Sequence, residues 1–385
     1  MEKYRLGDIC EIVSGSTPKT GVSEYWDGDK KWITPAEITD ESYIITDSVR
    51  KLTELGVTKT GLSSFPKGTV ILSSRAPIGK VAIAGCEMYC NQGFKNLICS
   101  QKIYNRYLYW FLKGNTEYLN SLGRGATFKE ISKQIVASIE INVPDMEQQM
   151  QAAENLERVS SIIRLRKQEL QKLDDLIKAR FVELFGDPLI GSGRYPKVPL
   201  GGLTEVGSSK RIFEKEYVSE GVSFYRTKEI VELSKGNRIT TELFITKERY
   251  DEIRSEYGVP QKGDLLISAV GTIGVIWIVD GKNDFYYKDG NLLRVSATER
   301  FVPEYLKHLL EVLIGAYKSE MSSGTAYAAL TISALKEMMV YDVPYAEQKQ
   351  FATFVTQTDK SKAVIQKALD EAQLLFDSLM QKYFG

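Results

Sequence analysis

The chain has 385 residues, of which 43% are hydrophobic and 26% are charged, a composition that excludes a disordered or fibrous protein. Its 50 Lys and Arg residues equal its 50 Asp and Glu residues, which argues against nonspecific nucleic-acid binding through a large basic excess. Sequence-specific reading through locally basic loops stays compatible with this balance. At about 100 to 200 residues per domain, the length predicts two domains.

Histidine and cysteine are too scarce to suggest a metal centre or an imidazole base. His308, the one histidine of the sequence, lies in the apolar run 305–310, which is typical of a helix interior, so we expect a structural role. Cys86 and Cys90 lack a second pair to complete a zinc site, and we expect reduced packing thiols. Residues 1–7 do not resemble a signal peptide and no apolar run approaches about 18 residues, so we expect a cytoplasmic protein without membrane contact.

The two halves of the chain repeat one another. When residues 1–186 are laid over residues 198–385, short segments match in the same order, which identifies two diverged copies of one unit. The matched anchors are Leu6-Gly7 with Leu200-Gly201, Lys67-Gly68 with Lys262-Gly263, Ile78-Gly79 with Ile273-Gly274, Val143-Pro144 with Val343-Pro344, Glu147-Gln148 with Glu347-Gln348, and Phe185-Gly186 with Phe384-Gly385.

The first part of each copy reads as a globule of strands and helices. Short runs of β-branched and aromatic residues alternate with turn residues around Gly79 and again around Gly274, which predicts strands and hairpins. A helix is expected to follow, over residues 104–122 in the first copy and 303–321 in the second. This mixture predicts an α+β globule.

Each copy ends in a long helix. Asp145 can cap the first one with Gln148 three residues on, and apolar residues then recur in steps of three and four until Gly186. A similar stripe begins at Phe351 in the second copy. At roughly 38 residues and 1.5 Å per residue, each helix measures about 57 Å. Stripes of this width call for a partner, so we expect antiparallel packing into a rigid rod with a globule at each end; two separate surface helices are the alternative.

The predicted organisation therefore has four parts. Residues 1–145 and 187–345 form two pseudo-repeated mixed α/β domains, and residues 146–186 and 346–385 form two long antiparallel helices that make a coiled coil. The fold class is α+β.

The duplicated motifs resemble one known family over the whole chain. They are Leu6-Gly7-Asp8-Ile9 with Leu200-Gly201-Gly202-Leu203, the loop Ser14-Gly15-Ser16-Thr17-Pro18, the segments 74–79 and 91–96, the junction 144–149, and the helix end Leu184-Phe185-Gly186-Asp187-Pro188. In this order they resemble the specificity (S) subunit of Type I restriction-modification systems. The second copy departs from the pattern at 208–211 and 288–291, as expected if the two domains read different bases.

The resemblance implies a subunit without catalytic activity of its own. In that family each globule is a target recognition domain that reads one half-site of a split, asymmetric sequence in double-stranded DNA, and the helices are conserved spacer regions. The implied partners are two methyltransferase (M) subunits and two restriction-motor (R) subunits. S-adenosylmethionine, ATP and Mg²⁺ are expected on those partners, and no cofactor or metal on this chain.

The sequence itself offers no convincing catalytic set. Gly79-Lys80 is followed by Val81, which breaks a phosphate-binding loop, and no Asn/Asp-Pro-Pro-aromatic run for amino methylation occurs. Gly191-Ser192-Gly193 reads as a flexible joint. Glu347-Gln348-Lys349 matches the tail of a metal-nuclease motif, but it lacks a nearby upstream carboxylate.

Loop residues suited to DNA contact are present in both domains. Arg and Lys can recognise guanine, Asn and Gln adenine, and small hydroxyls and basic groups phosphate, although many of these side chains will be plain solvated surface. The candidates are Ser16, Thr17, Lys19, Lys31, Ser74, Arg75, Lys80, Gln92, Lys95, Asn96, Arg124 and Thr127 in the first domain, and Lys210, Arg211, Arg226, Lys228, Ser268, Thr272, Lys288, Asn291 and Thr325 in the second.

Three alternatives stay open. In the first, the chain is a specificity allele that is inactive or silent until it recombines. In the second, it is the recognition part of a single-chain restriction-modification enzyme. In the third, it is a structural coiled-coil protein. The balanced charge adds a prediction of its own: the isolated chain binds DNA weakly, because larger partners supply much of the affinity for phosphate.

Overall fold

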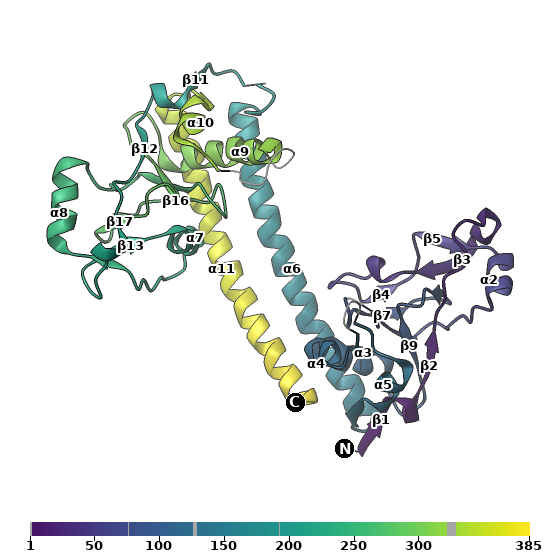
Figure 1. The fold of residues 1–385 in the computed structure, drawn as a ribbon. Helices are drawn as coiled ribbons and strands as arrows, with labels where there is room; N and C mark the ends of the chain where they lie inside the picture. Colours follow the sequence, from purple (N-terminus) through teal and green to yellow (C-terminus); the bar gives the residue numbers. More distant parts are fainter. Residues whose placement is uncertain (1, 76, 126–128, 192, 322–328) are drawn as a thin grey trace. The chain divides into compact units, whose positions relative to one another are not determined.

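The computed structural model describes residues 2–75, 77–125, 129–191, 193–321 and 329–385, which form two units. Unit 1 combines residues 1–167 with 367–385, and unit 2 covers residues 168–366. Each unit therefore holds one globular domain and parts of the two long helices, α6 (Met146–Phe185) and α11 (Tyr345–Phe384) (Figure 1).

Among its described residues, unit 1 forms a five-stranded sheet, a three-stranded sheet and a separate pair of strands. The strands are β1 (Glu2–Arg5), β2 (Cys10–Ser14), β3 (Trp26–Ile33), β4 (Ile44–Ile45), β5 (Arg50–Leu52), β6 (Val70–Leu72), β7 (Val81–Ala84), β8 (Tyr89–Cys90), β9 (Lys95–Cys99) and β10 (Glu140–Val143). The larger sheet has the order β2-β9-β6-β7-β4, the smaller one β5-β3-β8, and β1 pairs with β10. Neighbours are antiparallel except the pairs β4·β7 and β3·β8.

Unit 2 repeats most of this topology, but its larger sheet has no counterpart of β4 among the described residues. Its strands are β11 (Lys197–Pro199), β12 (Val206–Ser208), β13 (Val222–Tyr225), β14 (Phe244–Ile245), β15 (Leu265–Ser268), β16 (Ile276–Ile278), β17 (Phe285–Tyr287), β18 (Leu292–Val295) and β19 (Met339–Tyr341). The order β12-β18-β15-β16 matches β2-β9-β6-β7, the parallel pair β13·β17 matches β3·β8, and β11·β19 matches β1·β10. The repeat found in the sequence is therefore a repeat of the fold.

Helices of different lengths connect these strands. In unit 1 they are α1 (Leu6–Ile9), η1 (Ser23–Tyr25), η2 (Pro35–Glu37), α2 (Glu54–Thr60), α3 (Asn105–Gly114), α4 (Thr116–Ser121) and α5 (Lys133–Ser138). In unit 2 they are η3 (Leu200–Gly202), η4 (Glu214–Glu216), α7 (Thr227–Ser234), α8 (Lys247–Glu256), α9 (Pro303–Met321) and α10 (Ile332–Glu337).

One predicted helix is broken. The sequence predicts a single helix over 104–122, but the structure has α3 and α4 with a break at Asn115, whose φ of −106° and ψ of 25° are not helical. The Asn115 side chain donates to the carbonyl of Phe111 at 2.8 Å, a local hydrogen bond with which Asn competes against regular helix. The counterpart α9 is continuous over Pro303–Met321, as predicted.

The turn between β6 and β7 explains one of the repeat anchors. Gly79 and its counterpart Gly274 have φ of +92° and +87°, a region that side chains disfavour. A Cβ added to Gly79 would lie 2.9 Å from Cγ2 of Thr116, and one on Gly274 would lie 2.8 Å from Cγ2 of Ile314. Both glycines are required because the same turn packs closely against a helix in each unit.

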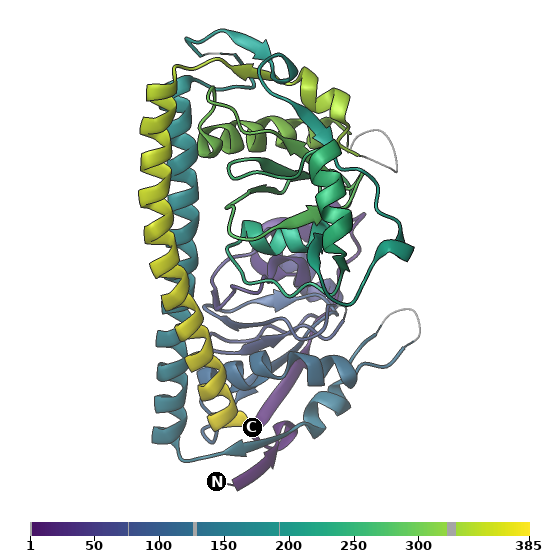
Figure 2. The ribbon, with the colours of Figure 1, turned by 90° about the vertical axis from the view of Figure 1, so that its left-hand side faces the viewer.

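The long helices pack antiparallel within each unit, which confirms that part of the predicted fold. Figure 2 shows the ribbons of α6 and α11 side by side. In unit 1, Phe376 and Phe384 near the end of α11 contact Trp110 and Tyr107, and Asn155 near the start of α6 donates to the Tyr383 hydroxyl at 3.0 Å. The apolar stripe thus buries one face of each helix against its partner and the globule.

In unit 2 the opposite ends of the helices meet. Phe181 and Phe185, at the end of α6, pack against Tyr305 and Phe351, with the Phe185 and Tyr305 rings 5.0 Å apart. Lys362 of α11 pairs with Asp174 of α6 at 2.7 Å.

The predicted cap at the start of α6, in unit 1, is also confirmed. The Asp145 side chain accepts a hydrogen bond from the Gln148 backbone N–H at 2.8 Å.

The structure corrects the repeat alignment at the start of the long helices. The residue that corresponds to the buried Gln348 is Gln149 rather than Gln148. The Gln149 amide donates to the Lys102 and Pro144 carbonyls at 3.1 and 2.9 Å, and the Gln348 amide donates to the Arg300 and Val343 carbonyls at 3.0 and 2.8 Å. The matching Glu-Gln letters hid a shift of one residue.

The predicted four-part division is not tested by this arrangement. It separates each globule from the helix that follows, whereas the packing groups part of each helix with each globule. The domain boundaries stay a prediction.

Candidate nucleic-acid interface

Four segments of unit 1 meet around the turn between β6 and β7. The Ser16 backbone N–H donates to the Cys90 carbonyl at 3.1 Å, and the Trp32 indole donates to the Ser16 carbonyl at 3.1 Å. The Ser74 N–H donates to the Gly93 carbonyl at 2.7 Å, and the Ser74 carbonyl accepts from Ile131 at 2.9 Å. Segments far apart in the sequence thus form one connected loop surface.

The turn itself is shaped by a buried hydroxyl. Ser73 donates to the Pro77 carbonyl at 2.8 Å and accepts the Lys80 N–H at 2.9 Å. In unit 2, Ser268 does the same with the Thr272 carbonyl and with the Val275 N–H, the latter at 2.9 Å. These serines set the conformation of the turns.

Arg75, Glu130 and Lys95 form a charge cluster beside the turn of unit 1. Arg75 Nε donates to Glu130 Oε2 at 3.0 Å, and Lys95 Nζ lies 3.3 Å from both Glu130 Oε1 and Ser74 Oγ. Partial burial acts to raise the pKa of Glu130, but the hydrogen bonds from Arg75 and Lys95 outweigh it and lower the pKa. Glu130 is therefore charged at neutral pH. The Arg75 side chain is 44% exposed and that of Lys95 only 9%.

Other predicted residues of unit 1 lie on the same loops. The Thr17 hydroxyl donates to the Gln92 side chain, which joins two of the segments. Lys80 reaches the Pro35 carbonyl at 3.2 Å and Lys31 the Thr46 carbonyl at 2.6 Å. These lysines hold neighbouring loops while staying partly exposed.

The corresponding loops of unit 2 carry different charge pairs. Arg211 Nε donates to Asp289 Oδ2 at 2.8 Å, and Lys288 Nζ lies 3.5 Å from Asp289 Oδ1. Hydrogen bonding and attraction from Asp289 raise the pKa of Arg211. Lys210 lies over the Tyr257 ring, 4.8 Å from its centroid.

A second acidic residue organises the start of α7. Arg226 Nη2 and Lys228 Nζ lie 3.3 and 3.5 Å from Glu229 Oε1, and the Glu229 side chain is 1% exposed. Glu229 thereby gathers two of the predicted cations at one helix end.

The predicted residues differ in their access to solvent. Lys19, Arg75, Gln92, Arg124, Lys210, Arg211, Lys228, Thr272 and Asn291 are exposed, and Ser16, Thr17, Lys31, Lys80, Arg226 and Lys288 are half-buried. Thr127 and Thr325 lie outside the described residues.

Four predicted residues are covered by other parts of the chain. Ser74, Lys95, Asn96 and Ser268 are buried, so they make contacts within the protein, and their contact with DNA stays a prediction. Asn96 is fully buried and its Nδ2 donates to Cys90 Sγ at 3.0 Å. A motif read along the chain does not show which loop residues the neighbouring segments cover.

The acidic residues were missed by the sequence reasoning. Glu130, Asp289 and Glu229 each bind at least one predicted cation, but the search for Arg, Lys, Asn, Gln and hydroxyl residues did not include carboxylates. The available signal was position, since Asp289 follows Lys288 in the loop that precedes β18.

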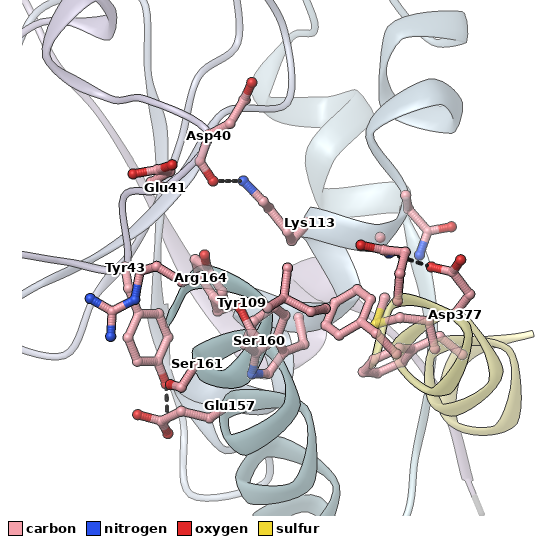
Figure 3. A pocket seen from close by; sticks show the side chains of 18 of the residues that line it. Asp40, Glu41, Tyr43, Tyr109, Lys113, Glu157, Ser160, Ser161, Arg164 and Asp377 are labelled. Atoms are coloured by element: carbon pink, nitrogen blue, oxygen red, sulfur yellow. Dashed lines mark hydrogen bonds between the residues drawn. The ribbon is translucent and has the colours of Figure 1, made fainter. Parts of the chain in front are cut away.

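A separate cleft lies in unit 1 between α3, the start of α6 and the end of α11 (Figure 3). Its volume is about 770 Å³, and Tyr43, Tyr109, Trp110 and Phe376 contribute aromatic walls. In Figure 3, Lys113 reaches the Asp40 carbonyl and Tyr43 donates to Glu157. Of the predicted DNA-binding residues that the structure describes, none lines this cleft.

His308 has a structural role, and the described residues offer neither a metal site nor a membrane-spanning helix. His308 Nδ1 lies 3.3 Å from Glu311 Oε2, and its ring packs edge-on against Phe351. Across the described ranges, no group of three His, Cys, Asp or Glu residues is placed to hold a metal ion. No helix in the described part of the chain has the length and apolar character needed to cross a membrane.

Comparison with known proteins gives consistent matches. The family model of the Type I restriction modification DNA specificity domain matches residues 1–175 and again residues 194–373. The Type I restriction enzyme MjaIX specificity subunit of Methanocaldococcus jannaschii is 39% identical over 186 residues, which are 48% of this chain and 43% of that protein. The chain thus spans less than half the length of that relative.

Further matches extend over more of the chain. A putative type I restriction enzyme specificity subunit of Haemophilus influenzae, S.HindORF215P, is 25% identical over 74% of this chain and 71% of its own length. The crystal structure of a Type I restriction-modification S subunit from M. genitalium has a TM-score of 0.59 at 16% identity and covers 100% of this chain and 96% of that one. A chain from a study of assembly and conformational transition of the type I R-M system has a TM-score of 0.57 at 18% identity, covering 99% and 97%. These likenesses are in the fold.

Proposed function

The chain belongs to the Type I restriction-modification specificity family, and from this premise we propose that it reads a bipartite, asymmetric DNA site for a Type I restriction-modification complex. Each unit reads one half-site through the loops around one connection between strands. This connection is residues 73–80 in unit 1 and residues 268–275 in unit 2. One observation carries the proposal. The two units share the same backbone arrangement, but their turns expose different side chains, for example Arg75 in unit 1 and Thr272 in unit 2. Two readers of this kind suit two unlike half-sites.

The partners would supply the chemistry. We assign methylation to two M subunits and cleavage to two R subunits, with S-adenosylmethionine, ATP and Mg²⁺ bound there. The balanced charge of this chain supports such a division, because a DNA reader without a basic excess needs affinity for phosphate from elsewhere. The isolated chain is expected to bind DNA weakly and the assembled methyltransferase tightly.

The long helices would set the distance between the half-sites. Both α6 and α11 contain 40 residues and contribute to both units. At 1.5 Å per residue, such a helix measures about 60 Å, and one turn of DNA is about 34 to 36 Å. The number of helical residues therefore determines how many unread base pairs separate the half-sites.

Methylome sequencing tests this function. The chain is expressed with its methyltransferase subunit in a host that lacks other adenine methylation, and the expected result is one new split, asymmetric methylated motif. A host that expresses the methyltransferase subunit alone is the control and should gain no motif. If the two subunits copurify and no motif arises, the chain is not an active specificity subunit.

A further inference from the structure

The same turn occupies the same frame in both units, which allows residues to be matched one by one. Gly79 N–H donates to the Ser73 carbonyl at 3.1 Å, and Gly274 N–H donates to the Ser268 carbonyl at 2.8 Å. Arg75 follows the turn serine by two residues, as Val270 follows Ser268. The position of Arg75 in unit 1 is therefore that of Val270 in unit 2.

The partners of Arg75 are matched in the same way. The Ser74 carbonyl accepts from Ile131, and the Ala269 carbonyl accepts from Leu330, both at 2.9 Å. Glu130 and Ala329, which directly precede these donors, are therefore equivalent. Lys95 pairs with Ser14 across the sheet as Leu293 pairs with Ser208, so Lys95 and Leu293 are also equivalent. The charge cluster Arg75, Glu130 and Lys95 corresponds to Val270, Ala329 and Leu293, a set that we call the apolar cluster.

We propose that these two clusters read different kinds of base edge at one structural place. In unit 1, Arg75, positioned by Glu130, hydrogen-bonds a guanine of its half-site. In unit 2, Val270 contacts the C5 methyl group of a thymine of the other half-site. This inference rests on the proposed function.

The geometry of the charge cluster suits guanine. Glu130 holds Nε of Arg75, and neither Nη nitrogen has a partner among the described residues. Two parallel donors at the end of an Arg side chain match the O6 and N7 acceptors of guanine in the major groove. The guanidinium end of Arg75 that Glu130 does not bind is thus the end that can read a base.

Glu130 weakens the attraction between Arg75 and a phosphate at this place. Its carboxylate is charged and 35% exposed, so it repels a phosphodiester, whereas a base edge carries no net charge. Buried Lys95 balances Glu130 and leaves the cluster with one net positive charge, that of Arg75. Glu130 is itself fixed by two backbone hydrogen bonds with Arg124, both 3.0 Å long. It is a positioning residue for Arg75.

The apolar cluster lacks the means to make such hydrogen bonds. Leu293 is buried, Ala329 is half-buried, and Val270 is 42% exposed on the turn. An exposed aliphatic side chain discriminates bases mainly through contact with the thymine methyl group. The two half-sites should therefore differ chemically at this place, with guanine on one side and thymine on the other.

The first experiment compares methylated motifs of variants with that of the wild-type complex. Arg75→Ala and Arg75→Lys should each relax recognition at one guanine and leave the other half-site unchanged. Glu130→Gln should relax the same guanine more weakly, and Glu130→Asp should restore part of it. Val270→Ala should relax one thymine in the other half-site. Lys3→Gln is the matched control, since Lys3 forms an exposed ion pair with Glu140 at 2.6 Å and should leave the motif intact.

A second experiment removes single groups from the DNA. Binding of the assembled methyltransferase is measured by fluorescence anisotropy on its own motif. Replacing the assigned guanine with 7-deazaguanine should weaken wild-type binding by about tenfold and leave binding by the Arg75→Ala complex unchanged. Replacing the assigned thymine with uracil should weaken the wild type by severalfold and leave the Val270→Ala complex unchanged.

Several results would overturn the inference without touching the proposed function. One is a wild-type motif without guanine in one half-site or without thymine in the other. Another is an Arg75→Ala complex that loses affinity equally for all sequences, which would identify a phosphate contact. A 7-deazaguanine penalty that is equal in wild type and Arg75→Ala would also contradict it. Failure of the proposed function is separate, because the wild-type complex would then produce no split motif at all.

Discussion

The turns of unit 1 and unit 2 share a backbone but not a surface. Ser73 and Ser268 make equivalent buried hydrogen bonds, and Gly79 and Gly274 have similar positive φ angles. The exposed residues two positions after these serines are Arg75 and Val270, which differ in charge, length and hydrogen-bonding capacity. The comparison teaches that the frame and the reading surface are specified by different residues, so one can diverge while the other is kept.

The largest effect is expected from changing the helices that join the two units. Inserting one heptad after Leu170 in α6 and a matching heptad after Leu369 in α11 adds about 10 Å of helix. The methylated motif should then have a longer unread spacer, or methylation should be lost, while any half-sites still read keep their bases. The unaltered chain is the control in methylome sequencing. An unchanged spacer would show that the helices do not measure it.

Removal of an aromatic ring should destabilise the protein more at the end of α6 than at the end of α11. Phe185 is fully buried, and Phe185→Ala should lower the free energy of unfolding by about 3 to 5 kcal/mol. Its counterpart Phe384 is half-buried, so Phe384→Ala should cost less, because part of the cavity is filled by solvent. Calorimetry of the full chain measures both. Equal losses for the two variants would contradict the difference in burial.

The buried glutamines should behave alike, because they belong to the shared frame. Gln149→Ala and Gln348→Ala each leave buried backbone groups without partners, at a cost of about 1 to 3 kcal/mol. Gln148→Ala is the control, since Gln148 is exposed and should change stability by less than about 0.5 kcal/mol. Stability is measured by denaturant unfolding. If Gln148→Ala lowered the free energy of unfolding more than Gln149→Ala, the match of Gln148 with Gln348 in the sequence alignment would be correct after all.

The smallest effect concerns pH and the charge cluster. The pKa of Glu130 is lowered from its ordinary value of 4.5, so its ion pairs stabilise the fold fully above pH 4.5 and lose their contribution as the pH falls through the lowered pKa. The difference in stability between wild type and Glu130→Gln should be about 0.2 to 1 kcal/mol at neutral pH, because the pair is partly exposed. Melting temperatures measured from pH 7 to pH 3 should converge at the acid end. Divergence there would mean that Glu130 is not held as an anion.

Much of the fold followed from patterns along the chain. The steps of three and four in the apolar stripe identified both long helices, and the repeated Lys-Gly and Ile-Gly anchors marked equivalent turns. The break at Asn115 was not predicted, because the hydrogen bond from its side chain to Phe111 competes with a helix that the apolar pattern alone favours. The one-residue shift of the repeat alignment at Gln149 was not predicted either, because identical residues in two sequence segments do not show which side chain is buried.

The candidate interface was predicted by residue type but not by environment. Arg75, Gln92 and Arg124 are exposed on the connected loops, whereas Lys95 and Asn96 point inward although they lie in the same motif. Successive residues of a strand face opposite sides, but β9 is covered on both sides where it leaves the loop, and no local pattern shows that.

The sequence by itself determined the duplication, the long helices and the loops that carry polar groups, because these depend on periodicity and on order along the chain. The family was indicated by the resemblance of the duplicated motifs and shown by the match to the family model. Tertiary structure alone decided that Glu130 holds Arg75, that Asp289 holds Arg211, and that Val270 occupies the place of Arg75. Such pairings join residues tens of positions apart, and their geometry follows from hydrogen bonds between segments that meet only in the folded protein.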